Sequence, residues 1–158
     1  MPKDWVAVDI EAAAFFAADH AVVENGKVYV NGGFWSMLRF PSYPAVQPTL
    51  SIVAVIHVPW RAYQQDHRFS IGLQDSDGKD LPLNIAGEFR VGAGVDMRVG
   101  DPTLMPLAVS INNFTIETAG DYAFTLSVDG TEISRYQVRA IQVAVPSPQP
   151  SAPPPPAE

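Results

Sequence analysis

The residues best suited to bind a ligand lie in one short stretch of the chain. Trp60 and Tyr63 supply aromatic rings, and Asp66 and His67 supply polar groups shortly after them. Exposed rings beside polar groups are typical of sites that bind a sugar, a peptide or an apolar ligand. The stretch therefore indicates a binding patch. In the alternative interpretation, Trp60 closes one end of the hydrophobic core and His67 caps a strand through its ring nitrogens.

A second candidate is a run of carboxylates. Asp75, Asp77 and Asp80 offer oxygen ligands at close spacing, and calcium prefers several such ligands. The glycine at position 78 does not match an EF-hand loop, and one short loop offers few ligands. We interpret the run as a charged hairpin turn and only as a weak metal site.

Catalytic chemistry finds little support in the sequence. The chain has no cysteine, and no Gly-x-Ser-x-Gly motif marks a serine nucleophile. His20, His57 and His67 lack the spacing that places two metal ligands on one face. His57 is in register with Val53 and Val55, which predicts a hydrogen-bonded histidine near the end of a buried strand. We expect no catalytic residues and no cofactor. A metal-dependent enzyme with ligands from distant strands remains an alternative, because sequence does not show spatial proximity.

The elements that must position these residues are β-hairpins. Asn25-Gly26, Asp77-Gly78 and Asp129-Gly130 each lie between runs of β-branched and aromatic residues. Such dipeptides tolerate the positive φ angles of tight hairpin turns. Each of them therefore predicts two antiparallel strands.

Alternation and turn signals together predict ten short strands and little helix. The expected strands are residues 5–10, 14–23, 27–30, 34–40, 50–58, 68–74, 88–91, 104–111, 122–128 and 131–143, with an irregular, proline-containing loop at 40–48. Strand 50–58 is apolar on both faces, which predicts a central strand covered on both sides. The fold class is all-β: a two-sheet antiparallel sandwich, Ig-like or jelly-roll-like, with a barrel as the alternative.

Strand 50–58 also separates two groups of aromatic residues. Nine extended residues span roughly 30 Å, so Trp35, Phe40 and Tyr43 should lie at one end of the sandwich and Trp60 and Tyr63 at the other. The two groups cannot form one pocket.

The C-terminal segment differs in composition from the rest of the chain. Seven prolines lie between Pro146 and Pro156. We expect a folded domain over residues 1–143 and a disordered tail over 144–158 with polyproline II character. Such a tail can dock on an aromatic groove of a protein partner.

Charge and hydropathy narrow the class of partners. The formal net charge of −7 repels a phosphate backbone, so we expect no nucleic-acid partner.

No apolar segment approaches the length of a membrane span, so we expect a soluble protein. The apolar run 12–18 is flanked by acidic residues, which favours a buried strand over a secretion signal. The absence of cysteine suits a reducing compartment, and we expect the cytoplasm.

Several segments match a known pattern in order and spacing: residues 18–21, 26–30, 32–35, 58–60, 67–68, 75–78 and 87–92. In these segments the chain resembles an uncharacterised family of bacterial single-domain proteins, catalogued as a domain of unknown function. The similarity covers about residues 14–143. It implies a β-sandwich of unassigned activity and supplies no catalytic residues.

These observations favour a non-catalytic β-sandwich that acts through protein contact, as an accessory or structural subunit, by its tail or by an exposed strand edge. Self-association through such an edge is also open. The alternative is a module that binds a small ligand or a carbohydrate through Trp60 and Tyr63.

Overall fold

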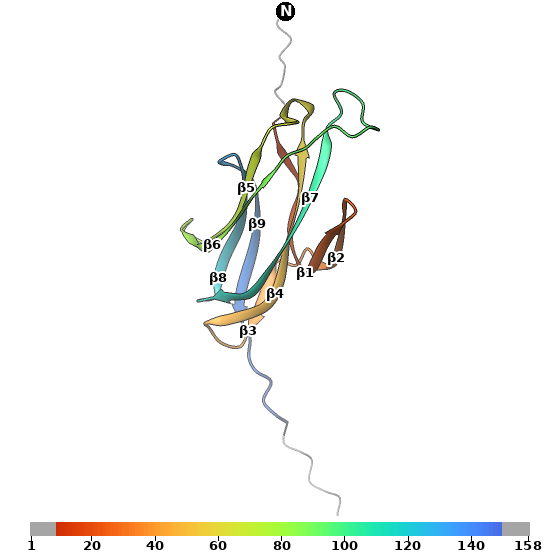
Figure 1. The fold of residues 1–158 in the computed structure, drawn as a ribbon. Coiled ribbons are helices and arrows are strands. Elements are labelled where there is room, and N and C mark those ends of the chain that lie inside the picture. Colours follow the sequence, from red (N-terminus) through yellow and green to blue (C-terminus); the bar gives the residue numbers. More distant parts are fainter. Residues whose placement is uncertain (1–8, 150–158) are drawn as a thin grey trace, which may run out of the picture.

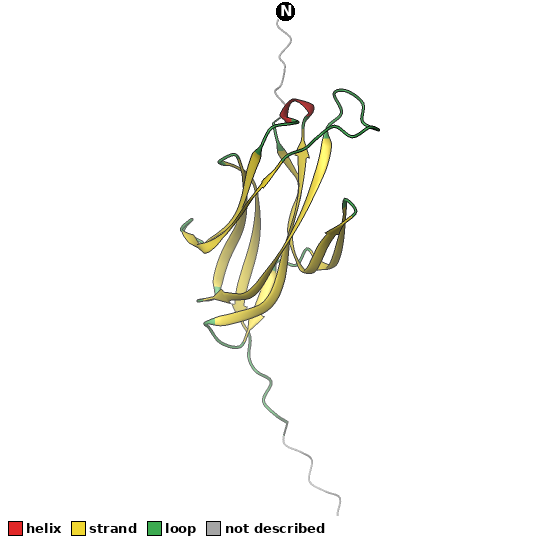
Figure 2. Cartoon of the chain, in the orientation of Figure 1, coloured by secondary structure: helices red, strands yellow, loops and turns green. Residues whose placement is uncertain are grey.

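The computed structural model describes residues 9–149, which form two stacked β-sheets (Figure 1). One sheet has the strand order β2-β1-β4-β7 and the other β3-β9-β8-β5-β6. The strands are β1 (Glu11–Glu24), β2 (Lys27–Gly33), β3 (Met37–Phe40), β4 (Ala45–Val58), β5 (His67–Gln74), β6 (Asp80–Phe89), β7 (Thr103–Ile116), β8 (Gly120–Val128) and β9 (Thr131–Gln142). Within this part of the chain, the only helical element is a single 3-10 turn, η1 (Trp60–Ala62) (Figure 2). The all-β sandwich predicted from the sequence is confirmed.

All three predicted hairpins form. Asn25-Gly26 joins β1 to β2, Asp77-Gly78 joins β5 to β6, and Asp129-Gly130 joins β8 to β9, each as an antiparallel pair. Asn25 and Gly26 have φ angles of 51° and 72°, and Asp129 and Gly130 have 50° and 82°. Two consecutive positive φ angles are the geometry that matches the twist of the flanking strands.

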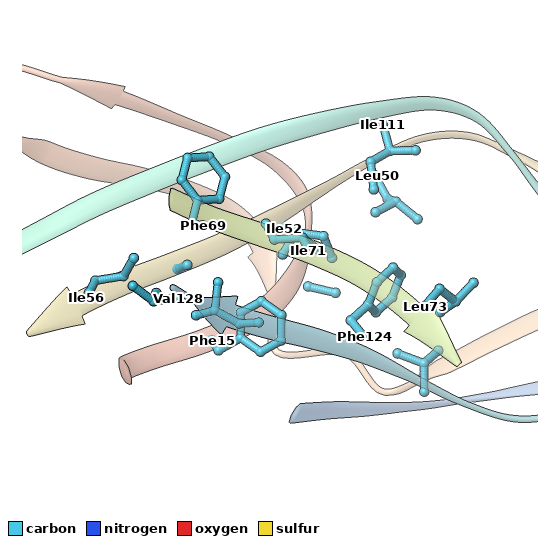
Figure 3. Close-up of a cluster of buried hydrophobic side chains, with 14 of the residues drawn as sticks. Phe15, Leu50, Ile52, Ile56, Phe69, Ile71, Leu73, Ile111, Phe124 and Val128 are labelled. Atoms are coloured by element: carbon cyan, nitrogen blue, oxygen red, sulfur yellow. The ribbon is translucent and has the colours of Figure 1, made fainter. Parts of the chain in front are cut away.

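The core lies between the two sheets and is lined by alternate residues of the central strands (Figure 3). Leu50, Ile52 and Ile56 of β4 face Ile71 of β5 and Phe124 of β8, and all five are almost fully buried. Burial of each such side chain contributes about 1.5–3 kcal/mol. The core therefore fixes the stacking of β4 against β5 and β8.

The outer face of β4 is covered as well. Beyond Ala18, β1 leaves β4 and pairs with β2, and together they form an arm (residues 19–33). The arm packs back on its own sheet, where Ala21 and Val28 join a second apolar cluster around Phe16 and Val53. The Ala21 N–H donates a hydrogen bond of 3.1 Å to the Ser51 hydroxyl. The prediction that this strand has both faces covered is confirmed.

The start of β4 and the end of β7 bend together over one end of the core. The side chains that face inward change parity along both strands: Leu50 and Ile111 are buried on one side of the bend, and Ala45 and Phe114 on the other. Asn113 sits between them with a φ of 53°. A single residue of β7 in the left-handed conformation thus bends both strands, and their pairing continues on either side of the bend.

Several sequence predictions differ from the structure. Residues 80–87, which no predicted strand includes, belong to β6, and residues 45–48, predicted as irregular, belong to β4. β3 is shorter than predicted and pairs with β9 in parallel. Most of the expected strand 5–10 lies outside the described residues, and Asp9 and Ile10 are not in a strand. β9 ends at Gln142, residues 144–149 form no regular element, and the rest of the expected tail lies outside the described residues.

Candidate functional site

The four residues predicted to form a binding patch do lie together, at one end of the sandwich. β4 ends at Val58, η1 carries Trp60, and β5 begins with His67. Trp60 and Tyr63 have ring centroids 4.9 Å apart. The connection between β4 and β5 therefore closes this end of the core with aromatic side chains.

The rings face the protein interior. Tyr63 is buried, Trp60 is half-buried, and both pack against the main core. The Tyr63 hydroxyl points to the sulfur of Met97, 4.0 Å away. Asp66 is exposed and forms an ion pair with Arg90 at 3.3 Å. Carbohydrate platforms need flat rings that are open to solvent, and neither ring has that exposure here.

His67 links two loops that are distant in sequence. It is 6% exposed, and both of its ring nitrogens have acceptors. Nε2 donates to the Ala62 carbonyl at 2.8 Å, and Nδ1 lies 2.7 Å from Oδ2 of Asp129. The other carboxylate oxygen of Asp129 accepts a hydrogen bond of 3.0 Å from the Arg68 N–H. These contacts tie η1 and the start of β5 to the turn between β8 and β9.

This arrangement favours the charged form of both partners. Burial alone lowers the pKa of His67, but the hydrogen bonds to Ala62 and Asp129 outweigh it, so its pKa is raised above the ordinary value. The pKa of Asp129 is lowered, first by its hydrogen bond to His67 and then by that from the Arg68 N–H. When the ring is protonated, His67 and Asp129 therefore form a partly buried ion pair.

A histidine beside an aspartate resembles part of a hydrolytic triad, but this pair lacks the free atom that catalysis needs. A general base must present an unoccupied nitrogen to its substrate. In His67 the second nitrogen already donates to a backbone carbonyl, and the ring is buried. The pair is arranged to hold loops together.

An open depression of about 530 Å³ borders the pair on its solvent side. Ala62 and Asp129 contribute to its wall, together with Arg61, Gln65 and Thr131. Arg61 forms an ion pair with Asp9 at 2.6 Å. The wall has apolar as well as polar residues, and Asp129 has both of its oxygens engaged by the protein.

In the second candidate site, the carboxylates of Asp75 and Asp80 accept hydrogen bonds from residues of their own hairpin. Oδ1 of Asp75 accepts hydrogen bonds from the N–H groups of Asp77 and Lys79, at 2.9 and 3.0 Å. Oδ1 of Asp80 accepts one from the Gln74 side chain at 2.9 Å. Such side-chain contacts are typical of aspartates that stabilise turns. Within residues 9–149, no three histidine or acidic side chains gather as a metal site would require.

The remaining histidines lie apart. His20 is exposed on the arm, and His57 pairs with Glu11 and Leu104 on the outer face of β4. The prediction of a hydrogen-bonded His57 is wrong for its Nδ1, which is buried without a partner among the described residues. Its position at the β1 and β7 interfaces shields that nitrogen from water without offering an acceptor.

The sequence did not indicate where apolar side chains would be exposed. Val22, Tyr29, Val30 and Phe34 are exposed on the arm or directly after it, and Val95 and Val99 are exposed in the loop between β6 and β7. Strand patterns alone assign β-branched and aromatic residues to a core, so they give no signal for such surfaces. The Asn25-Gly26 turn predicts that a hairpin forms, but not how its faces are covered.

Comparison with known proteins gives a family and no activity. No curated protein matches the chain. In the described part of the chain, no helix is long and apolar enough to cross a membrane. One family model matches residues 13–141, which include seven of the nine strands completely and nearly all of β1 and β9. The chain therefore belongs to a family of unknown function (DUF6941).

Proposed function

We propose that this protein is a non-catalytic interaction module that binds a protein partner through the arm. The observation that carries the proposal is the set of apolar side chains that the arm exposes. Val22 and Tyr29 face each other across the hairpin and are 43% and 52% exposed, and Phe34 is 71% exposed. Apolar side chains gathered at solvent are typical of contact surfaces.

The backbone of the arm supports the same function. The two sheets end in β2, β7, β3 and β6. β7 contains Pro106, β6 contains Pro82, and β3 has four residues, features that hinder the addition of another strand. β2 has seven residues without proline, and six of them are exposed. A partner strand can therefore extend this sheet at β2, with Tyr29 supplying apolar contact.

The rest of the chain is consistent with this role. His67, Trp60 and Tyr63 are engaged in the fold, and the chain carries a net charge of −7. We expect the partner to offer an apolar strand with neutral or basic flanks. The chain has no cysteine and so can form no disulfide, which suits a reducing compartment. We therefore propose that the interaction takes place in the cytoplasm.

The test compares the full wild-type chain with three altered forms in their native cell. A chain with Val22→Thr and Tyr29→Thr keeps strand-forming residues but loses the apolar surface, and a chain that ends at Val143 lacks the proline-rich tail. Arg135→Ala, on the exposed face of β9, is the control. We expect a stoichiometric partner, identified by mass spectrometry and rebound as a purified protein, with the control and the shortened chain but not with the arm variant.

Three outcomes contradict the proposal. Retention of the partner by the arm variant would show that the arm is not the interface. Loss of the partner from the chain that ends at Val143 would place the interface on the tail. The absence of a stoichiometric partner from every form, including the full chain, would argue against an interaction module.

A further inference from the structure

The arm contains the same reactive dipeptide twice. Asn25-Gly26 forms its turn, and Asn31-Gly32 lies near the end of β2. In such a pair the backbone nitrogen of the glycine can attack the side-chain amide of the asparagine before it, because glycine has no side chain to hinder the approach. The other asparagines of the chain precede larger residues. By sequence the two asparagines of the arm are therefore equivalent, and only the fold distinguishes them.

Asn25-Gly26 is open to solvent at the free end of the arm (Figure 1). Residues 24–27 are all exposed, and a Cβ atom on Gly26 would meet no atom within 4 Å. The Asn25 side chain forms no hydrogen bond with any residue that the structure describes. The turn can therefore change conformation without loss of packing, and the asparagine amide can reach the glycine nitrogen.

Asn31-Gly32 is held in place by its neighbours. Asn31 pairs with His20 in the ladder between β1 and β2, and just beyond the dipeptide the Phe34 N–H donates to the Ala17 carbonyl at 2.9 Å. The carboxylate of Asp19 fills the space beside Gly32 where a Cβ atom would lie. β2 must separate from β1 before Asn31 can react, and such an opened strand is a minor state of a folded protein.

Neighbouring charges favour the same asparagine. The glycine nitrogen attacks after it has lost its proton, so a nearby carboxylate that no cation balances opposes the reaction. At the turn, Lys27 follows Gly26 directly and pairs with Glu24, so a cation and an anion are both present. At Gly32, the adjacent Asp19 carboxylate forms no ion pair within the described range. Deprotonation is therefore less favourable at Gly32 than at Gly26.

We propose that Asn25 is a site of spontaneous deamidation and that the fold protects Asn31 from the same reaction. The Gly26 nitrogen gives its proton to solvent and bonds to Cγ of Asn25, and the Cγ–Nδ2 bond breaks as ammonia leaves. Water then opens the resulting cyclic imide at either of its carbonyls. The product is an aspartyl or an isoaspartyl residue at position 25, and each form carries a new carboxylate.

Both products change the arm at its turn. The isoaspartyl form adds a methylene to the backbone, and a two-residue turn fixes the register of its strands, so the pairing of Glu24 with Lys27 is disturbed. The aspartyl form places a second negative charge beside Glu24. An aged chain should therefore bind the partner of the arm less well. This consequence rests on the proposed function, whereas the chemical step does not.

The test is peptide mapping by mass spectrometry of the purified full chain, incubated at mildly alkaline pH in the folded state and in urea. Deamidation changes the peptide mass, and enzymatic methylation identifies the isoaspartyl product. In the folded chain we expect Asn25 to react at least about tenfold faster than Asn31, because only Asn31 requires local opening of paired strands. In urea the two rates should be similar.

Three results would overturn the proposed modification. They are equal rates at the two asparagines of the folded chain, an Asn25 that reacts in urea but not in the folded chain, and a preference for Asn25 that is as large in urea as in the folded chain.

Partner binding by fresh and aged protein tests the consequence separately. Asn25→Gly is the control, because a Gly-Gly turn keeps the positive φ angles and has no amide to lose. The aged wild type should lose much of its partner, and the aged control should keep it. Retention by the aged wild type would overturn the effect on the arm. If fresh protein binds no partner, the proposed function fails while the deamidation of Asn25 stands on the peptide map.

Discussion

At the scale of single residues, one buried histidine holds two loops together, and its charge sets how strongly. Only the imidazolium form of His67 can donate to both the Ala62 carbonyl and the Asp129 carboxylate. Because the pKa of His67 is raised in the folded state, this stabilisation is complete below the unfolded value of about 6.5 and is lost as the pH rises through the raised pKa. The lowered pKa of Asp129 sets the acid limit, where the stabilisation disappears as the carboxylate is protonated.

Substitution of Asp129 by Asn tests this ion pair. Asn suits the φ of 50° at this position, so the turn should be kept while the charge is removed. We expect the free energy of unfolding to fall by about 1 kcal/mol between the two pKa values, a small effect because Asp129 is half exposed. The difference from the wild type should shrink above the pKa of His67. Urea unfolding across a pH series measures the first effect, and NMR titration of the His67 ring measures the second.

Asp77→Asn is the matched control, since Asp77 occupies another Asp-Gly turn and its side chain faces solvent. It should leave the pKa of His67 unchanged. A wild-type pKa below 6.5, or a pKa that does not fall in Asp129→Asn, would show that the carboxylate does not hold the proton on His67.

At the scale of elements, the sequence predicted the turns, because their geometry depends on the residues within the turn. Asn25-Gly26 and Asp129-Gly130 predicted hairpins because positive φ angles are set within the turn itself. Most of β6 was missed, and the predicted strand 88–91 covers only its end, because Pro82 and Gly87 are typical of loops, yet an edge strand tolerates both. The contact of His67 with Asp129 spans 62 residues, and it follows only from the pairing of β5 with β8. From the sequence we could predict that His67 lies at the same end of the sandwich as Trp60. We could not predict that Asp129 is its partner.

The arm depends on a close approach of its two strands, which a pair of glycines can test. Gly26 and Gly32 both have positive φ angles, 72° and 60°. A Cβ atom on Gly26 would meet nothing, whereas one on Gly32 would collide with the carboxylate of Asp19. We expect Gly26→Ala to cost about 1 kcal/mol of unfolding free energy, and Gly32→Ala about 1–3 kcal/mol more.

Urea unfolding of the two alanine variants measures this difference. In an Asp19→Ala background, Gly32→Ala should cost little more than Gly26→Ala, because the obstructing carboxylate is gone. Equal costs for the two glycines in the wild-type background would show that the arm does not pack as closely as described.

At the scale of the whole molecule, the fold should be complete at the end of β9. β3 pairs with residues 139–142 of β9, and the Val143 N–H donates to the Phe40 carbonyl at 3.0 Å, whereas residues 144–149 add no element. We therefore expect a chain that ends at Val143 to melt within about 2 °C of the full chain. A chain that ends at Val138 loses the partner of β3 and the buried Ala140, and should lose more than about 3 kcal/mol of unfolding free energy.

Calorimetry of the full chain and of the chains that end at Val143 and Val138 measures how far the C-terminal residues stabilise the fold. Together with the partner test, it separates that structural role from any role in binding. If the chain that ends at Val143 keeps its melting temperature and its partner, the tail is needed for neither the fold nor the interface, and the interface lies on the sandwich or its arm. If it keeps its melting temperature but loses its partner, the tail acts as a ligand for that partner. A marked fall in melting temperature would instead show that residues beyond Val143 pack on the sandwich, and that the domain extends farther than its last strand.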